Sequence, residues 1–189
     1  MTGLTRRGII AGAGTAMVVG RAGALTPEPP MPPVLHNSLA PLRRFVGAWD
    51  GRGEGQPGES IVVRLYEPAV GGRYLMARNS SSYLPQRKNP KGERHKDLGF
   101  FSFDKARKRF VLRQFNIEGF VNTFVATTED FVNDTIIVES EAIENIPKGY
   151  RARETYRFSG ADAFEEIFEI AEPGKDFALY SHNHLRRAD

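Results

Sequence analysis

The ten residues from Tyr150 to Ser159 read YRARETYRFS, and their polarity alternates with a period of two. One face of this segment is mostly apolar and carries Tyr150, Ala152, Glu154, Tyr156 and Phe158. The other face is hydrophilic and carries Arg151, Arg153, Thr155 and Arg157. Because successive side chains of a strand point to opposite faces, the pattern predicts a β-strand with one face buried.

The same period continues through the chain from Gly47 onward, interrupted at short intervals by turn residues such as Gly, Pro, Asn and Asp. We predict ten strands: Ala48–Glu54, Ser60–Glu67, Arg73–Ser82, Leu98–Asp104, Arg109–Asn116, Phe120–Thr127, Asp134–Glu144, Tyr150–Ser159, Ala163–Glu172 and Phe177–Arg187. The polar, basic stretch 84–94 is expected to be a mobile loop. No helical pattern separates the strands, so their connections should be antiparallel hairpins. The sequence therefore predicts an all-β fold, a closed antiparallel barrel of about ten strands.

The first 24 residues resemble an export signal. Arg6 and Arg7 precede a weakly apolar run that is too short to span a bilayer, and Ala22-Gly23-Ala24 has the small residues of a cleavage site. Paired arginines with modest hydrophobicity are typical of a twin-arginine signal peptide, which predicts a periplasmic or secreted protein without an integral membrane segment after cleavage. A short amphipathic helix of a cytosolic protein and a retained membrane anchor are the alternatives.

Residues 25–37 contain five prolines, which predicts an extended linker. A short helix should follow, with Ser38 as its N-cap, Pro41 in its first turn, and Leu39, Leu42 and Phe45 at near-helical spacing. We assign residues 38–189 to the barrel domain.

Composition excludes several functions. The chain of 189 residues has no cysteine, so disulfides, thiolate metal sites and cysteine nucleophiles are excluded. Its 26 basic residues exceed its 23 acidic ones, but three arginines belong to the predicted signal, so the mature chain would be neutral. A nucleic-acid-binding role therefore loses its electrostatic support.

Polar side chains interrupt the predicted inward faces of the barrel at Gln114, Asn122, Ser140 and Glu154. A buried polar group without a partner costs a few kcal/mol, so a solid core would rarely hold them. An apolar cavity with a few polar groups explains them directly. The alternative is that Glu154 forms a structural ion pair with an interior arginine such as Arg78.

The segment from Leu39 to Gly55 carries L-x-x-L-x-x-F-V-G-x-W-x-G-x-G-x-G. It resembles the opening of small calycin-like barrels. The double glycine Gly71-Gly72 further along is similar to one found in an uncharacterised bacterial family, which is related to nitrobindin-type and fatty-acid-binding-protein-like barrels. The resemblance implies a lipocalin-like barrel whose short helix closes one end, with Trp49 filling the closed base.

In nitrobindin-like barrels, a histidine near the last strand ligates haem iron. The resemblance therefore makes His184 a candidate haem ligand, with His182 two residues earlier; surface histidines are the alternative. Two histidines at this spacing could also hold a metal ion, but no third ligand is evident, so we predict no metal site. His95 follows the polar insertion and is expected to be exposed.

The favoured function is binding of a small hydrophobic or amphipathic molecule in the lumen. The candidate ligand-binding residues are Arg78, Gln114, Asn122, Ser140, Glu154, Tyr156, Phe168 and Tyr180. Arg78 would favour a carboxylate-bearing ligand. The alternatives are a haem protein and a barrel enzyme that uses Glu154 or a terminal-strand histidine as acid or base, although no nucleophile elbow, P-loop or H-E-x-x-H motif is present.

Overall fold

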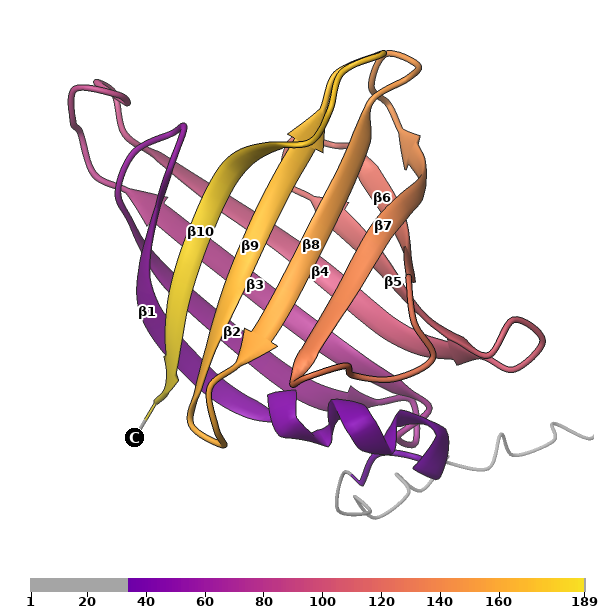
Figure 1. Cartoon of the computed structure of the whole chain (residues 1–189). Helices are drawn as coiled ribbons and strands as arrows, with labels where there is room; N and C mark the ends of the chain where they lie inside the picture. The colour runs from indigo at the N-terminus through magenta and orange to yellow at the C-terminus, as the bar shows by residue number, and fades with distance from the viewer. Residues whose placement is uncertain (1–33, 189) are drawn as a thin grey trace, which may run out of the picture. The chain divides into compact units, whose positions relative to one another are not determined.

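The computed structural model describes residues 34–188, which form a closed barrel of ten antiparallel strands (Figure 1). The strands are β1 (Gly47–Gly55), β2 (Ser60–Ala69), β3 (Tyr74–Tyr83), β4 (Glu93–Asp104), β5 (Arg109–Asn116), β6 (Val121–Ala126), β7 (Thr135–Glu144), β8 (Arg151–Phe158), β9 (Ala163–Ala171) and β10 (Ala178–Arg187). Each strand pairs with its neighbours in sequence, and β10 returns to pair with β1. The predicted fold class is confirmed, and the barrel is consistent with a calycin-like architecture.

Most strand bounds lie within a residue or two of the prediction, but β4 begins five residues early. Glu93–Lys96 pair with Ser80–Tyr83 of β3, so part of the predicted loop 84–94 and the residues after it belong to the sheet. The first residues of β4 are polar and show no alternation of hydrophobicity, so the sequence did not predict this part of the strand. Side chains near the open end of a barrel can be hydrophilic on both faces.

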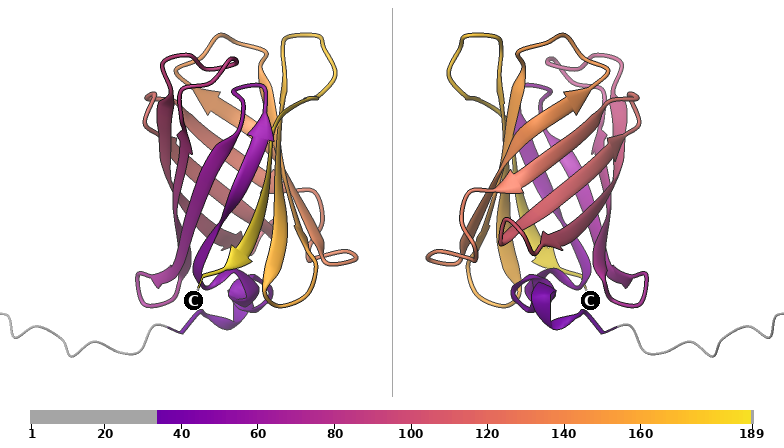
Figure 2. Two further views of the ribbon diagram at one scale, coloured as in Figure 1. Left: turned by 90° about the vertical axis from the view of Figure 1, so that its left-hand side faces the viewer. Right: turned by 90° about the vertical axis from the view of Figure 1, so that its right-hand side faces the viewer.

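The helix η1 (Asn37–Phe45) is a 3₁₀ helix that lies across one end of the barrel (Figure 2). Leu39, Leu42 and Phe45 are fully buried, as their spacing predicted. Its N-cap is His36 rather than Ser38, because the His36 ring nitrogen Nδ1 accepts a hydrogen bond from the Ser38 backbone N–H at 3.2 Å.

Aromatic side chains fill the half of the barrel next to η1. Trp49 is fully buried, donates from Nε1 to the Phe45 carbonyl at 2.6 Å, and packs edge-on against Phe164 with ring centroids 4.8 Å apart. The guanidinium of Arg187 lies 4.3 Å from the centroid of the Trp49 ring. This half is therefore a packed core, not a cavity.

The packed domain begins before the predicted boundary at Ser38. Leu35 is buried, and the His36 backbone N–H donates to the Gly72 carbonyl at 2.9 Å. Gly72 has a φ of +76°, and a Cβ there would lie 2.0 Å from the Val34 carbonyl oxygen, so this approach requires glycine. The signal peptide 1–24 and most of the linker lie outside the described residues. Within residues 34–188, no helix is long and apolar enough to cross a bilayer.

Candidate functional site

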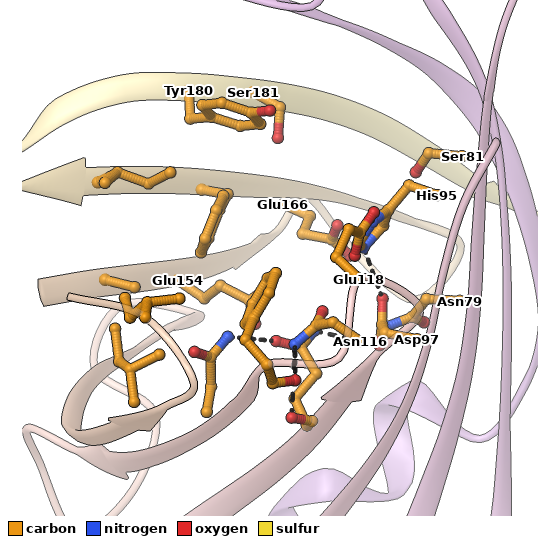
Figure 3. Close-up of a pocket in the computed structure, with 18 of the residues that line it drawn as sticks. Asn79, Ser81, His95, Asp97, Asn116, Glu118, Glu154, Glu166, Tyr180 and Ser181 are labelled. Atoms are coloured by element: carbon orange, nitrogen blue, oxygen red, sulfur yellow. Dashed lines mark hydrogen bonds and ion pairs between the residues drawn. The ribbon is translucent and has the colours of Figure 1, made fainter. Parts of the chain in front are cut away.

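A cavity of about 460 Å³ occupies the half of the barrel away from η1. We call the end of this cavity that is nearer to η1 its lower part and the opposite end its upper part. Apolar and aromatic side chains form much of its upper wall: Phe120, Ile143, Ile146, Tyr150, Phe168, Ile170 and Tyr180. Polar side chains from several strands form its lower part: Arg64, Asn79, Ser81, Asp97, Gln114, Asn122, Glu154, Glu166 and Asn183. Figure 3 shows side chains converging from opposite sides of the barrel.

A buried ion pair crosses the lower part of this cavity. Arg64 of β2 donates to both carboxylate oxygens of Glu166 of β9, at 2.6 and 3.0 Å, and both side chains are almost fully buried. Burial alone would raise the pKa of Glu166, but the charge and hydrogen bonds of Arg64 hold this pKa below its usual value. Asn183 also donates to Glu166, at 2.9 Å. The charge of Arg64 is therefore already neutralised within the barrel.

Glu154 lies close by but has no cationic partner. Its carboxyl accepts a hydrogen bond from the Tyr156 hydroxyl, and within residues 34–188 no arginine or lysine lies within ion-pair distance of it. Burial, followed by the negative charge of Glu166, raises the pKa of Glu154 to about 8. The carboxyl is therefore mostly protonated at neutral pH. The predicted alternative, an ion pair between Glu154 and an interior arginine, is wrong.

Side-chain amides form a chain of hydrogen bonds beside these carboxyls. Asn122 donates to Gln114 at 3.2 Å, Gln114 donates to Asp97 at 3.1 Å, and Asn79 donates to the same Asp97 oxygen at 2.8 Å. Within the described part of the chain, the buried amide oxygens of Asn79, Asn122 and Asn183 accept no hydrogen bond. All three residues line the cavity, but these oxygens are themselves buried in its wall, and the oxygen of Asn183 packs against Gly53 of β1.

His95 joins the wall from the start of β4, between the predicted loop and the predicted strand. Its Nδ1 lies 2.8 Å from Glu118 and its Nε2 lies 3.5 Å from Asp97 (Figure 3). Burial lowers the pKa of His95, but hydrogen bonds to Asp97 and Glu118 outweigh it and raise this pKa to about 9. His95 is therefore a cation held between two carboxylates, not a freely exposed side chain.

Of the ten predicted site residues, only some lie at the cavity. Five of them line the cavity: Gln114, Asn122, Glu154, Phe168 and Tyr180. Tyr156 is buried in the aromatic core, where its ring lies 5.2 Å from that of Phe45, and it reaches the site through its hydroxyl. Ser140 does not line the cavity, and its hydroxyl oxygen accepts a hydrogen bond from the Ala152 backbone N–H at 2.9 Å.

Arg78 was predicted to face the lumen, and this prediction is wrong. Its side chain is 58% exposed and lies 3.5 Å from Glu67 on the outer surface. The inward residues of β3 are the other alternate set, which includes Ala77 and Asn79. A shift of one residue in a strand moves every side chain to the opposite face, and the polar end of β3 carries too little hydrophobic pattern to set the register.

His182 and His184 also lie outside the lumen. The pairing of β10 with β9 is irregular between Leu179 and Ser181, so Tyr180 reaches the cavity while the following alternation places the histidines outside. These two histidines do not fit a haem bound in the lumen. Among residues 34–188, His95 is the one histidine that lines the cavity, and carboxylates face both of its ring nitrogens.

The cavity also holds five polar residues that were not predicted from the sequence: Arg64, Glu166, Asp97, Asn79 and Asn183. The first two could have been found from alternation, since Arg64 lies between inward Val62 and Tyr66, and Glu166 lies between inward Phe164 and Phe168. The others lie in strands with polar residues on both faces, where alternation carries no signal.

Together, the fold and the cavity define a closed ten-stranded β-barrel that is compatible with ligand binding. No protein-family model matches the chain, and a search of curated proteins gives no match. Among solved structures, the chain is similar to the crystal structure of Rv2717c from M. tuberculosis, with 19% sequence identity and a TM-score of 0.65. The similarity covers 82% of this chain and 100% of that one, and at this identity it supports the fold alone.

Proposed function

We propose that the barrel binds a small amphipathic molecule, with its apolar part against the upper wall and a hydrogen-bond-donating head in the lower part of the cavity. The observation that supports this most strongly is the division of one cavity between an apolar upper wall and a lower part rich in side-chain amides, among them Asn79, Gln114 and Asn122. After a small side-chain rotation, the amide oxygens of Asn79 and Asn122 would accept from a ligand hydroxyl, amine or amide N–H, which is worth about 1 kcal/mol for each hydrogen bond.

Charge in the cavity disfavours a carboxylate head. The expectation of a carboxylate rested on Arg78, which lies outside the barrel. Of the cations that line the cavity, Arg64 is paired with Glu166 and His95 lies between two carboxylates, while Arg151 donates to the Lys175 carbonyl at 2.8 Å. A ligand carboxylate could pair with Arg64 or His95 only by displacing a carboxylate of the protein, and Arg151 holds its charge on the exposed rim.

The upper wall suits an apolar group. Phe168 and Tyr180 pack edge-on with ring centroids 5.9 Å apart, and Ile143, Ile146 and Ile170 continue the apolar surface. Each 100 Å² of apolar ligand surface buried here would contribute about 2.5 kcal/mol. Burial therefore supplies most of the affinity, and the amide oxygens select the head group.

The test compares two ligands of equal chain length, a medium-chain alcohol and the corresponding carboxylate, by calorimetric titration. We expect tighter binding of the alcohol, and we expect Asn122→Leu to weaken that binding about tenfold by removing an acceptor. Arg78→Leu is the matched control and should leave the affinity unchanged, since Arg78 points outward. Tighter binding of the carboxylate, or binding that depends on Arg78 rather than Asn122, would contradict the proposal. Native mass spectrometry of protein from its own host would identify a retained ligand directly.

We further propose, from the N-terminal sequence alone, that the protein works outside the cytoplasm after export by the twin-arginine route. This location would place the barrel where it meets ligands of the cell envelope or the medium.

A second candidate function is proton-transfer catalysis. A cavity-lining carboxyl with a pKa of about 8 is poised to act as a general acid or base near neutral pH, and Glu154 is such a group. A ligand identified by mass spectrometry should then be converted by the wild-type protein and not by Glu154→Gln, whereas unchanged ligand after incubation with the wild type would favour simple binding.

A further inference from the structure

The barrel closes where its first strand meets its last, and the outer face of this β1–β10 pairing gathers three potential metal ligands. Glu54 lies directly opposite His182, and His184 follows two residues later on the same face of β10. The two imidazole rings have centroids 4.2 Å apart. One ligand atom from each of Glu54, His182 and His184 lies within 4.8 Å of the others.

Charged side chains of both signs surround these three residues. Glu165 of the neighbouring strand β9 places one carboxylate oxygen 3.5 Å from Nε2 of His182 and the other 3.9 Å from Nδ1 of His184. Arg157, 3.3 Å from Glu165, and the exposed Arg52, which lies directly opposite His184 on β1, offset part of this charge. Nε2 of His182 is buried and makes no hydrogen bond within residues 34–188.

The side chains can adjust to a metal ion. Glu54 and His184 are exposed, and His182 is about a quarter exposed, so small rotamer changes could bring their ligand atoms to metal-binding distances of about 2.0–2.2 Å. The backbone beneath them is a regular antiparallel ladder and holds the three positions in place. Exposed side chains change rotamer at little cost, whereas the hydrogen-bonded backbone of the two strands stays in place.

We propose that Glu54, His182 and His184 form a site for one Zn²⁺ ion on the outer surface of the barrel, with solvent at the fourth position. Two imidazoles and a carboxylate suit Zn²⁺ and similar transition metals, whereas Ca²⁺ and Mg²⁺ prefer all-oxygen sites. Glu165 adds negative charge beside the ion.

Such an ion would cross-link the two strands whose pairing closes the barrel. It would join β1 to β10, which are far apart in sequence and adjacent only in the folded state. A ligand that binds only the folded state stabilises it by mass action, so Zn²⁺ should raise the melting temperature. At a hundredfold excess of Zn²⁺ over its Kd, we expect a rise of about 5 °C or more.

The experiment uses the full chain, purified without a histidine tag and treated with EDTA. Calorimetric titration should show one Zn²⁺ per chain, the visible spectrum of bound Co²⁺ should report histidine ligation, and Ca²⁺ should not bind. His184→Ala and Glu54→Gln should each weaken Zn²⁺ binding at least tenfold. Both side chains are exposed, so these variants should melt like the wild type in EDTA.

Two controls separate this site from others. His36→Ala removes a distant histidine, and His95→Asn removes the histidine of the cavity; both variants should bind Zn²⁺ as the wild type does. Absence of stoichiometric binding, one ion per two chains, equal binding of Ca²⁺, or loss of binding in His95→Asn instead of His184→Ala would overturn the proposal. The outcome is independent of ligand binding in the cavity.

Discussion

Replacing Glu154 by glutamine should change how the stability of the barrel depends on pH. In the folded protein the pKa of Glu154 is raised to about 8 from an ordinary value of 4.5, chiefly by burial. Between these two pH values the folded state binds a proton that the unfolded state releases. The free energy of unfolding of the wild type therefore falls as pH rises through this window.

The expected magnitude follows from the two pKa values. Each pH unit between them removes about 1.4 kcal/mol, so the loss from Glu154 between pH 4.5 and pH 7 is about 3 kcal/mol. Glutamine cannot ionise, yet its amide oxygen can still accept the hydrogen bond from Tyr156. Glu154→Gln should therefore lack this loss and should be more stable than the wild type at pH 7, relative to pH 4.5, by about 3 kcal/mol.

Other titrating groups remain in both proteins and cancel in the comparison. His95 has a pKa raised to about 9, by hydrogen bonds to Asp97 and Glu118 that outweigh the opposing effect of its burial. Its stabilising contribution is complete below pH 6.5 and is lost as pH rises toward 9. Glu166, whose pKa is lowered by Arg64, contributes stability that is lost at acidic pH.

The assay is urea denaturation at a series of pH values, followed by the fluorescence of Trp49, the chain's single tryptophan, which is fully buried. The exposed Glu172→Gln is the matched control and should keep the wild-type pH dependence. Parallel curves for the wild type and Glu154→Gln would refute the reasoning, because they would show that Glu154 ionises in the folded protein as readily as in the unfolded chain.

Three other predictions concern stability and export. Trp49→Ala should lower the free energy of unfolding by about 3–5 kcal/mol, measured by circular dichroism in urea; an unchanged midpoint would show that the base of the barrel does not depend on this ring. Arg64→Met should cost about 3–5 kcal/mol by leaving Glu166 buried without a counter-charge, and adding Glu166→Leu should restore most of the loss, whereas a double variant no more stable than the single would contradict the ion-pair argument. Replacing Arg6 and Arg7 by lysine should leave precursor in the cytoplasm on cell fractionation, and normal export would rule out the twin-arginine signal.

The sequence predicted the strands best where one face is apolar. In β8, Ala152, Tyr156 and Phe158 alternate with arginines, and the structure places these three residues inside as expected. Prediction failed at the polar parts of β3 and β4, where Arg78 was placed inside and His95 was expected to be exposed. Burial of apolar surface sets strand register, so strands that are hydrophilic on both faces leave register undetermined.

The irregularity in β10 shows a second limit. Strict alternation puts Tyr180, His182 and His184 on one face, but the register shift after Leu179 separates the tyrosine from the histidines. Because a bulge depends on how neighbouring strands pair, it cannot be predicted from the composition of one strand.

By itself, the sequence determined that a short helix is followed by an antiparallel barrel, because hydrophobic periodicity and turn residues are local properties. Only the tertiary structure decided which polar groups meet. Arg64 and Glu166 are 102 residues apart in the chain, and so close a contact between them exists only once β2 and β9 face each other across the lumen. Pairings across a barrel follow from strand number, register and bulges together, and these are fixed when the last strand meets the first.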